Sequence, residues 1–226
     1  MELDHVFIFT QEPEKAAEAL QQFGLTEGAP NTHPGQGTAC RRFFFENAYL
    51  ELVWVSNEVE VKSKAVAKTL LWERSQYQQT HYCPFGLCMR PPASEKPQPA
   101  LLFEDGWKYT PPYLPEGAFI NIVYNAAFPA EPLLFEIPHL NRMDKGQPNH
   151  PVQPLQHLWG FKEITKVVLF LPASLEHLSV AMQKVINKDR VAVVPANDFA
   201  ITLEMDHCPK GASQHFHPLL PLTIRW

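Results

Sequence analysis

The chain has 226 residues, enough for one large domain or two small ones with a substantial buried core. Its residues are 45% hydrophobic and 19% charged, which is typical of a globular protein and excludes a disordered chain. The formal net charge of -5 excludes the strong positive field that nucleic-acid-binding proteins present.

Two further features concern the compartment. No apolar run is long enough to cross a bilayer, and the acidic start at Glu2 and Asp4 lacks the basic and apolar regions of a signal peptide. The cysteines at 40, 83, 88 and 208 show neither redox nor zinc-knuckle spacing. We therefore predict a cytoplasmic protein with free thiols, and we expect neither nucleic acid nor a membrane as a partner.

The first strand is predicted over residues 3–9, where large apolar side chains alternate along the chain. This alternation puts His5 on the face that carries Leu3, Phe7 and Phe9. An imidazole on an apolar face needs a partner, which can be a metal ion or, in the structural alternative, a backbone group.

A helix is expected next, with Thr10 as its cap and Gly24 as its end. A short strand is predicted at 25–29, and a hairpin is predicted from strands at 39–45 and 49–55. The N-terminal part of the chain therefore predicts a strand, a helix and three further strands.

Two features of this unit are candidates for function. Glu51 lies on the last strand among apolar neighbours, so it is the second metal-competent side chain on a hydrophobic strand after His5. The loop at 31–38 is rich in glycine and polar groups that can approach a ligand, although an ordinary connection is the structural alternative. Its candidate residues are His33, Gly35, Gln36, Gly37 and Thr38.

The middle of the chain predicts connecting helices at 57–79 and strands at 85–89, 118–124 and 132–137. The last of these strands carries Glu136 between apolar residues, where a carboxylate needs water, a cation or a metal. The aromatic, proline-rich stretch at 107–115 is expected to be irregular and could wall a pocket.

The last third repeats the order of the first. A strand is predicted at 164–171, Ser174 caps a helix, and three strands follow at 190–194, 200–206 and 220–226. We therefore divide the chain into a first unit at 1–56, a connecting and middle segment at 57–140, a linker at 141–160 and a C-terminal unit at 161–226, which together could form one domain.

A unit of strand, helix and three strands, with His on its first strand and Glu on its last, resembles the vicinal oxygen chelate superfamily. More narrowly, LDHVFIF, HPGQGTACRRFFF and NAYLELVWV, followed by PPYLP, PLLFEI and LPLTIRW, are similar to the glyoxalase-like domain family. The resemblance implies an α+β fold in which repeated βαβββ modules curl into a cupped, mostly antiparallel sheet. It also implies that ligands from first and last strands converge on a divalent metal.

By position, the resemblance implies His5 and Glu51 as metal ligands from the first unit. Two alternatives are open for the second unit. If the middle segment supplies it, the ligand position on its last strand is Glu136, and its first strand offers Cys88 but no histidine.

If the last third supplies the second unit, the ligand positions fall on Lys166 and near Thr223, and neither is a usual metal ligand. The nearest carboxylate there, Glu204, lies on the third strand of that unit. Cys40 also departs from the pattern, because it stands where the relatives are expected to have asparagine.

With Glu136, the implied metal ligands are His5, Glu51 and Glu136. Such a set leaves coordination positions open for a substrate and suits Zn, Mn, Ni or Fe. A metal-free cup that binds a small molecule is the alternative.

Two functions are therefore considered. One is a metal-dependent lyase or isomerase acting on a small oxygenated organic molecule, in which the ion polarises a carbonyl and Glu51 or Glu136 moves a proton. The other is a non-catalytic protein of the same fold that sequesters a small molecule, and the resemblance allows a homodimer in either case. The expected substrate-binding residues are His33, Gly35, Gln36, Gly37, Thr38, Arg41, Trp54, Trp107 and Tyr113.

Overall fold

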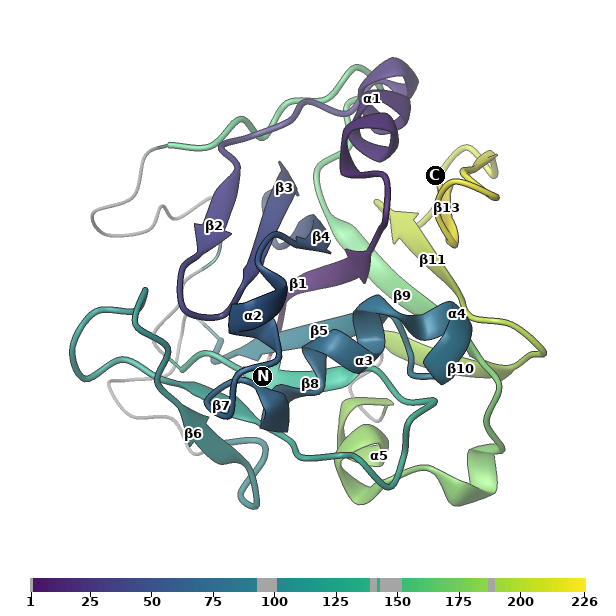
Figure 1. Cartoon of the computed structure of the whole chain (residues 1–226). Coiled ribbons are helices and arrows are strands. Elements are labelled where there is room, and N and C mark those ends of the chain that lie inside the picture. Colours follow the sequence, from purple (N-terminus) through teal and green to yellow (C-terminus); the bar gives the residue numbers. More distant parts are fainter. Residues whose placement is uncertain (1, 93–100, 139–141, 143–151, 187–189) are drawn as a thin grey trace.

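The structure, a computed structural model, describes residues 2–92, 101–138, 142, 152–186 and 190–226 (Figure 1). Its strands form two sheets, one of eight strands and one of five. Helices are short and few beside these sheets, so the α+β class predicted from the sequence is confirmed. No helix among the described residues is long and apolar enough to cross a membrane.

The first unit contains the elements that the sequence predicted, with two differences: the N-cap of the helix is Glu12 and not Thr10, and one strand is shifted. Its second strand lies at Asn31–His33, within the stretch expected to be a loop, so the strand predicted at 25–29 is wrong. The Gly24 stop is confirmed, because this residue adopts a left-handed conformation with a φ of 109° at the end of α1. The elements are β1 (Glu2–Phe9), α1 (Pro13–Phe23), β2 (Asn31–His33), β3 (Thr38–Phe44) and β4 (Tyr49–Val55).

The middle segment repeats the strand pairing of the first unit. In the eight-stranded sheet the order is β2-β3-β4-β1-β5-β8-β7-β6. The first strand of each half, β1 or β5, lies at the centre of the sheet, and the second strand, β2 or β6, lies at an edge. The last strand of each half pairs parallel with the first, and β1 pairs antiparallel with β5 between the halves. The strands are β5 (Phe85–Arg90), β6 (Trp107–Tyr109), β7 (Ile120–Ile122) and β8 (Leu133–Glu136).

Short helices connect the two halves, as the sequence predicted for this stretch. They are α2 (Glu58–Val61), η1 (Ala67–Thr69), α3 (Leu71–Ser75) and α4 (Tyr77–Thr80). Three buried side chains from this connection, Val61, Val66 and Leu71, pack into the same apolar cluster as Phe7. The connection therefore covers the face of the sheet that carries Phe7, which we call the inner face.

The C-terminal sheet has a different pairing. Its order is β10-β9-β11-β13-β12, and its first strand pairs parallel with the strand after the helix, not with the last strand of the segment. The last third is therefore not a second copy of the first unit in its strand order, and β12 was not expected from the sequence. The elements are β9 (Ile164–Leu171), η3 (Leu175–His177), α5 (Val180–Ile186), β10 (Val191–Pro195), β11 (Ala200–Met205), β12 (Ser213–His215) and β13 (Leu222–Arg225).

This five-stranded sheet packs on the outer face of the larger one. Val6, Leu50 and Leu134 of the large sheet share one buried cluster with Val167 and Leu169 of β9. The outer face is thus sealed by apolar packing, which leaves the inner face for chemistry. The domain boundaries remain a prediction, and the linker expected at 141–160 lies partly outside the described residues.

Candidate functional site

A β-bulge at Asp4 sets up the centre of the inner face. In the pairing of β1 with β5, Leu3 lies opposite Met89 and His5 lies opposite Cys88, so Asp4 is an extra residue without a partner. A bulge re-aims side chains along a strand. Leu3 accordingly joins the outer cluster, and the expectation that it shares a face with His5 is wrong because simple alternation breaks at the bulge.

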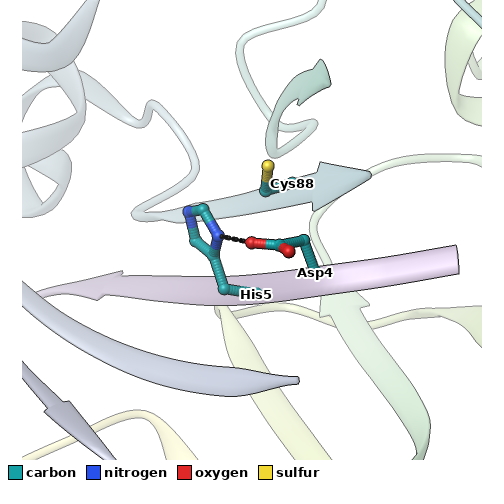
Figure 2. Close-up of side chains that lie close together, drawn as sticks. All are labelled: Asp4, His5 and Cys88. Atoms are coloured by element: carbon teal, nitrogen blue, oxygen red, sulfur yellow. Dashed lines mark hydrogen bonds and ion pairs between the residues drawn. The ribbon is translucent and has the colours of Figure 1, made fainter. Parts of the chain in front are cut away.

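The bulge lets two neighbouring residues interact through their side chains. Oδ1 of Asp4 lies 2.7 Å from Nδ1 of His5, and Figure 2 shows the carboxylate reaching along the strand to the ring. An ionised Asp4 accepts a hydrogen bond from Nδ1–H, which leaves the lone pair of His5 on Nε2. Asp4 therefore fixes both the tautomer and the direction of His5.

The free nitrogen of His5 faces Glu51. Nε2 lies 3.9 Å from Oε2 of Glu51, and both side chains are almost fully buried. The His5 ring stacks on Tyr49, with ring centroids 4.4 Å apart, and meets the edge of Phe135 on β8 at 5.3 Å. Phe135 is two strands away from His5, a span of roughly 10 Å in a flat sheet, so the short ring contact reflects the curl of the sheet.

Arg90 compensates the buried charge of Asp4. Nη1 of Arg90 lies 3.5 Å from Oδ2 of Asp4, and both side chains have at most 1% of their surface exposed. The same guanidinium donates to the backbone oxygens of Leu3 and Asn47 and pairs with Glu2. Oδ2 of Asp4 has no hydrogen bond to any described residue, so the ion pair is its main compensation.

Two thiols border the site, and both keep their protons. Cys88 completes with Asp4 and His5 a group whose ligand atoms lie within 4.8 Å of one another, and Figure 2 shows its sulfur on the neighbouring strand. Sγ of Cys40 donates to Oε1 of Glu51 at 3.4 Å. Burial raises the pKa of both thiols, so Cys40 acts as a hydrogen-bond donor where an asparagine was expected.

The loop that follows β2 joins this face through a polar network. Nδ1 of His33 and Nε2 of Gln36 both lie within 2.9 Å of Oγ1 of Thr38. The hydroxyl of Tyr113 donates to Oε1 of Gln36 at 3.0 Å. Burial lowers the pKa of His33, and the negative charge of Glu51 opposes this shift.

The network also connects the two edges of the curled sheet. Tyr113 follows β6, and His33 ends β2, which is the opposite edge strand. A side chain at Gly35 would come within 2.8 Å of Pro112, so the two loops touch there. Gly37 has a φ of 79°, and a side chain there would lie 2.3 Å from the backbone oxygen of Asn57. Both glycines are thus required by backbone geometry and close approach.

Several predicted site residues lie elsewhere. Arg41 and Trp54 alternate with Cys40 and Val53 of the inner face, so both point to the outer side, where Arg41 binds Glu27 through two hydrogen bonds. The cation opposite Glu51 in the strand register is Arg42. Neighbouring residues on a strand point to opposite faces of the sheet, so Arg42 and not Arg41 shares the inner face with Glu51. The sequence alone does not distinguish the two arginines.

Glu136 does not join His5 and Glu51. It follows Phe135 on β8 and so points to the outer face, where its carboxylate accepts from the backbone of Leu102 and Phe103 and from Nδ2 of Asn121. The expected arrangement of Glu136 opposite Glu51 is therefore wrong. Three donors satisfy the buried carboxylate without a metal, and Phe135 takes the inner position.

Sequence reasoning missed several residues of the site. Asp4 and Arg90 were not expected there because a bulge cannot be inferred from alternation. Tyr49 was overlooked because an aromatic residue at the start of a strand indicates core packing equally well. The Asp-His pair at the start of β1 was the available signal, since histidines that bind metals or transfer protons are commonly oriented by a carboxylate.

Comparisons with known proteins agree with this architecture. The family model of the glyoxalase-like domain matches residues 3–169, which include both halves of the large sheet. No curated protein matches the chain. Among solved structures, a hypothetical protein from Staphylococcus aureus has a TM-score of 0.57 at 10% sequence identity, covering 99% of this chain and 98% of that one. That likeness supports the fold, and the chain belongs to the glyoxalase-like domain family of the vicinal oxygen chelate superfamily.

Proposed function

We propose that the inner face binds a divalent metal ion through Nε2 of His5 and the carboxylate of Glu51, and that the protein acts as a lyase or isomerase on a small oxygenated organic molecule. The observation that supports this most is the hydrogen bond that Nδ1 of His5 donates to the carboxylate of Asp4. In metal-binding histidines the second ring N–H usually donates a hydrogen bond to a carboxylate, which orients the ring and raises its basicity.

The donor atoms fit such an ion. Ligand nitrogen and oxygen atoms lie about 2.0–2.2 Å from Zn and similar metals, so two ligands of one ion are at most roughly 4.2 Å apart. The separation of 3.9 Å between Nε2 of His5 and Oε2 of Glu51 is within that limit. Imidazole and carboxylate together suit Zn, Mn, Ni or Fe. Cys88 lies near Asp4 and His5, and its buried thiol keeps its proton, so it is not counted with His5 and Glu51.

When bound, the ion would supply a Lewis acid that polarises a carbonyl or enolate oxygen. The other roles belong to residues of the chain. Glu51 accepts a hydrogen bond from Cys40 on Oε1, so its Oε2 would either hold the ion or, when released from it, take up a proton. Thr38 and Gln36, at the start of β3 and in the loop before it, present polar groups for the oxygens of a substrate. Glu136, on the outer face, takes no part.

A second function is supported by a specific observation. On β5 and β8 the inner positions are Gly86, Cys88, Leu133 and Phe135, which include neither a histidine nor a carboxylate. A cup with one ligand-bearing half and one apolar half also suits a protein that sequesters a small molecule without a metal. Trp107 and Tyr113 would then serve as aromatic walls.

The metal content of purified protein tests the choice. We expect protein prepared without chelators to hold a near-stoichiometric transition metal, and His5→Ala and Glu51→Gln each to lose most of it, because each removes a direct ligand. His215→Ala is the control, since His215 is exposed on β12. Wild-type protein without metal, or His5→Ala with unchanged metal, would favour sequestration instead.

Asp4→Asn tests the orienting role separately. We expect about a 10-fold weaker affinity for Zn, because loss of such an outer partner typically costs 10–100-fold in metal affinity. Competition with a chromogenic chelator measures the affinity, and circular dichroism checks that the variant is folded. An unchanged affinity in a folded variant would remove Asp4 from the site.

A further inference from the structure

The inner face holds two buried donors that nothing in the described chain satisfies. Oη of Tyr109 and Nε1 of Trp107 are both inaccessible to solvent and have no hydrogen-bond partner among the described residues. Tyr109 has 5% of its surface exposed. Buried polar groups are nearly always paired, because leaving one unpaired costs most of its hydration free energy. Two such donors on one strand therefore indicate a missing acceptor.

Strand register places both donors on the inner face. Trp107 lies opposite Ile122 on β7, and Ile122 lies opposite Phe135 on β8, whose ring touches His5. Tyr109 is two residues further along β6 and so shares this face. The two rings are neighbours, with centroids 5.4 Å apart.

Tyr109 lies four residues before Tyr113, whose hydroxyl donates to Gln36 of the polar network. Burial raises the pKa of Tyr109 itself to about 12, so the phenol keeps its proton and acts as a donor. The two orphaned donors thus stand on β6, the edge strand that leads into the loop of Tyr113.

The surroundings define what the donors could bind. Between them and His5 the inner face is apolar, with Ile120, Ile122 and Phe135 in one cluster. Nζ of Lys68 lies 4.7 Å from the centre of the Trp107 ring, so a positive charge favours an electron-rich group nearby.

We propose that Trp107 Nε1–H and Tyr109 Oη–H bind a hydrogen-bond-accepting oxygen carried on an apolar, ring-sized molecule whose other end reaches His5 and Glu51. This proposal specifies the substrate class of the proposed function. It depends on that function for the contact between the other end of the molecule and His5 and Glu51. The donor pair itself requires no metal.

Tyr109→Phe separates a binding role from a structural one. Removing an unsatisfied buried hydroxyl should raise the melting temperature of the free protein by roughly 2 °C, while binding of acetophenone weakens about 5-fold for the lost hydrogen bond. Tyr124→Phe, on an exposed tyrosine, should change neither. Wild-type protein that does not bind acetophenone, or a Tyr109→Phe variant that binds it equally well, overturns the proposal.

The indole proton of Trp107 gives an independent measurement. In protein with ¹⁵N-labelled tryptophan, the Trp107 signal is identified with Trp107→Phe and should move downfield with acetophenone. It should not do so with α-methylstyrene, which has a methylene in place of the carbonyl oxygen. Equal shifts with both compounds would mean that the pocket selects shape and not an acceptor, and would also overturn the proposal.

Both experiments use chelator-treated protein, so their result is separate from the metal test. If Glu51→Gln and His5→Ala leave the metal content unchanged but acetophenone binding depends on Tyr109, the proposed metal function fails and the donor pair stands. The converse result would retain the metal site and reject the donor pair.

Discussion

Replacing Arg90 by methionine is expected to destabilise the protein by about 3–5 kcal/mol, the usual cost of leaving one partner of a buried ion pair uncompensated. Arg90 has at most 1% of its side chain exposed and is the cation beside the fully buried Asp4. Its loss also removes the hydrogen bonds that Nη1 donates to the backbone oxygens of Leu3 and Asn47. Thermal unfolding should show a decrease in melting temperature of roughly 10 °C.

Arg225→Met is a matched control for this change. Arg225 pairs with Glu204 on the surface with about half of its side chain exposed, so its removal should cost less than about 1 kcal/mol. The double variant Arg90→Met with Asp4→Asn should regain part of the stability, because it removes the uncompensated carboxylate as well. If Arg90→Met melts like Arg225→Met, Arg90 does not stabilise Asp4.

Glu136→Gln is expected to lower the melting temperature by roughly 6 °C and to leave the metal content unchanged. Its carboxylate accepts three hydrogen bonds while fully buried, and an amide cannot accept from all three donors without opposing one of them with its own N–H. The metal content should not change because Glu136 points away from His5.

Glu204→Gln provides the comparison for Glu136, since it alters a carboxylate in a partly exposed pair and should change the melting temperature little. Metal analysis of both variants is made beside His5→Ala. Loss of metal from Glu136→Gln to the extent seen in His5→Ala would place Glu136 in the site after all.

The sequence predicted the first unit well because strong local signals coincide there. The strands at 39–45 and 49–55 are long and apolar, and Gly24 ends the helix through a conformation that favours glycine. The middle unit was harder because β6 and β7 have three residues each, too few to show a period. Its equivalence to the first unit becomes visible only in the pairing of the strands.

The candidate site was predictable to the extent that alternation holds. His5 and Glu51 were expected to lie together, and the structure places them 3.9 Å apart. Glu136 and Arg41 were expected inside but point outside, because their strands carry apolar or charged residues on both faces and parity cannot be assigned from the sequence. Asp4 required knowledge of a bulge, which depends on the partner strand.

The contact between Gly86 and Phe7 has a consequence for how this site can evolve. A Cβ atom at Gly86 would lie 2.0 Å from the ring of Phe7, so this inner position on β5 is closed to any larger residue while Phe7 remains. A histidine there would require a smaller residue at position 7 at the same time. Ligation through position 86 is therefore separated from the present protein by coupled substitutions, and a lineage changing one residue at a time would lose packing before gaining a ligand there.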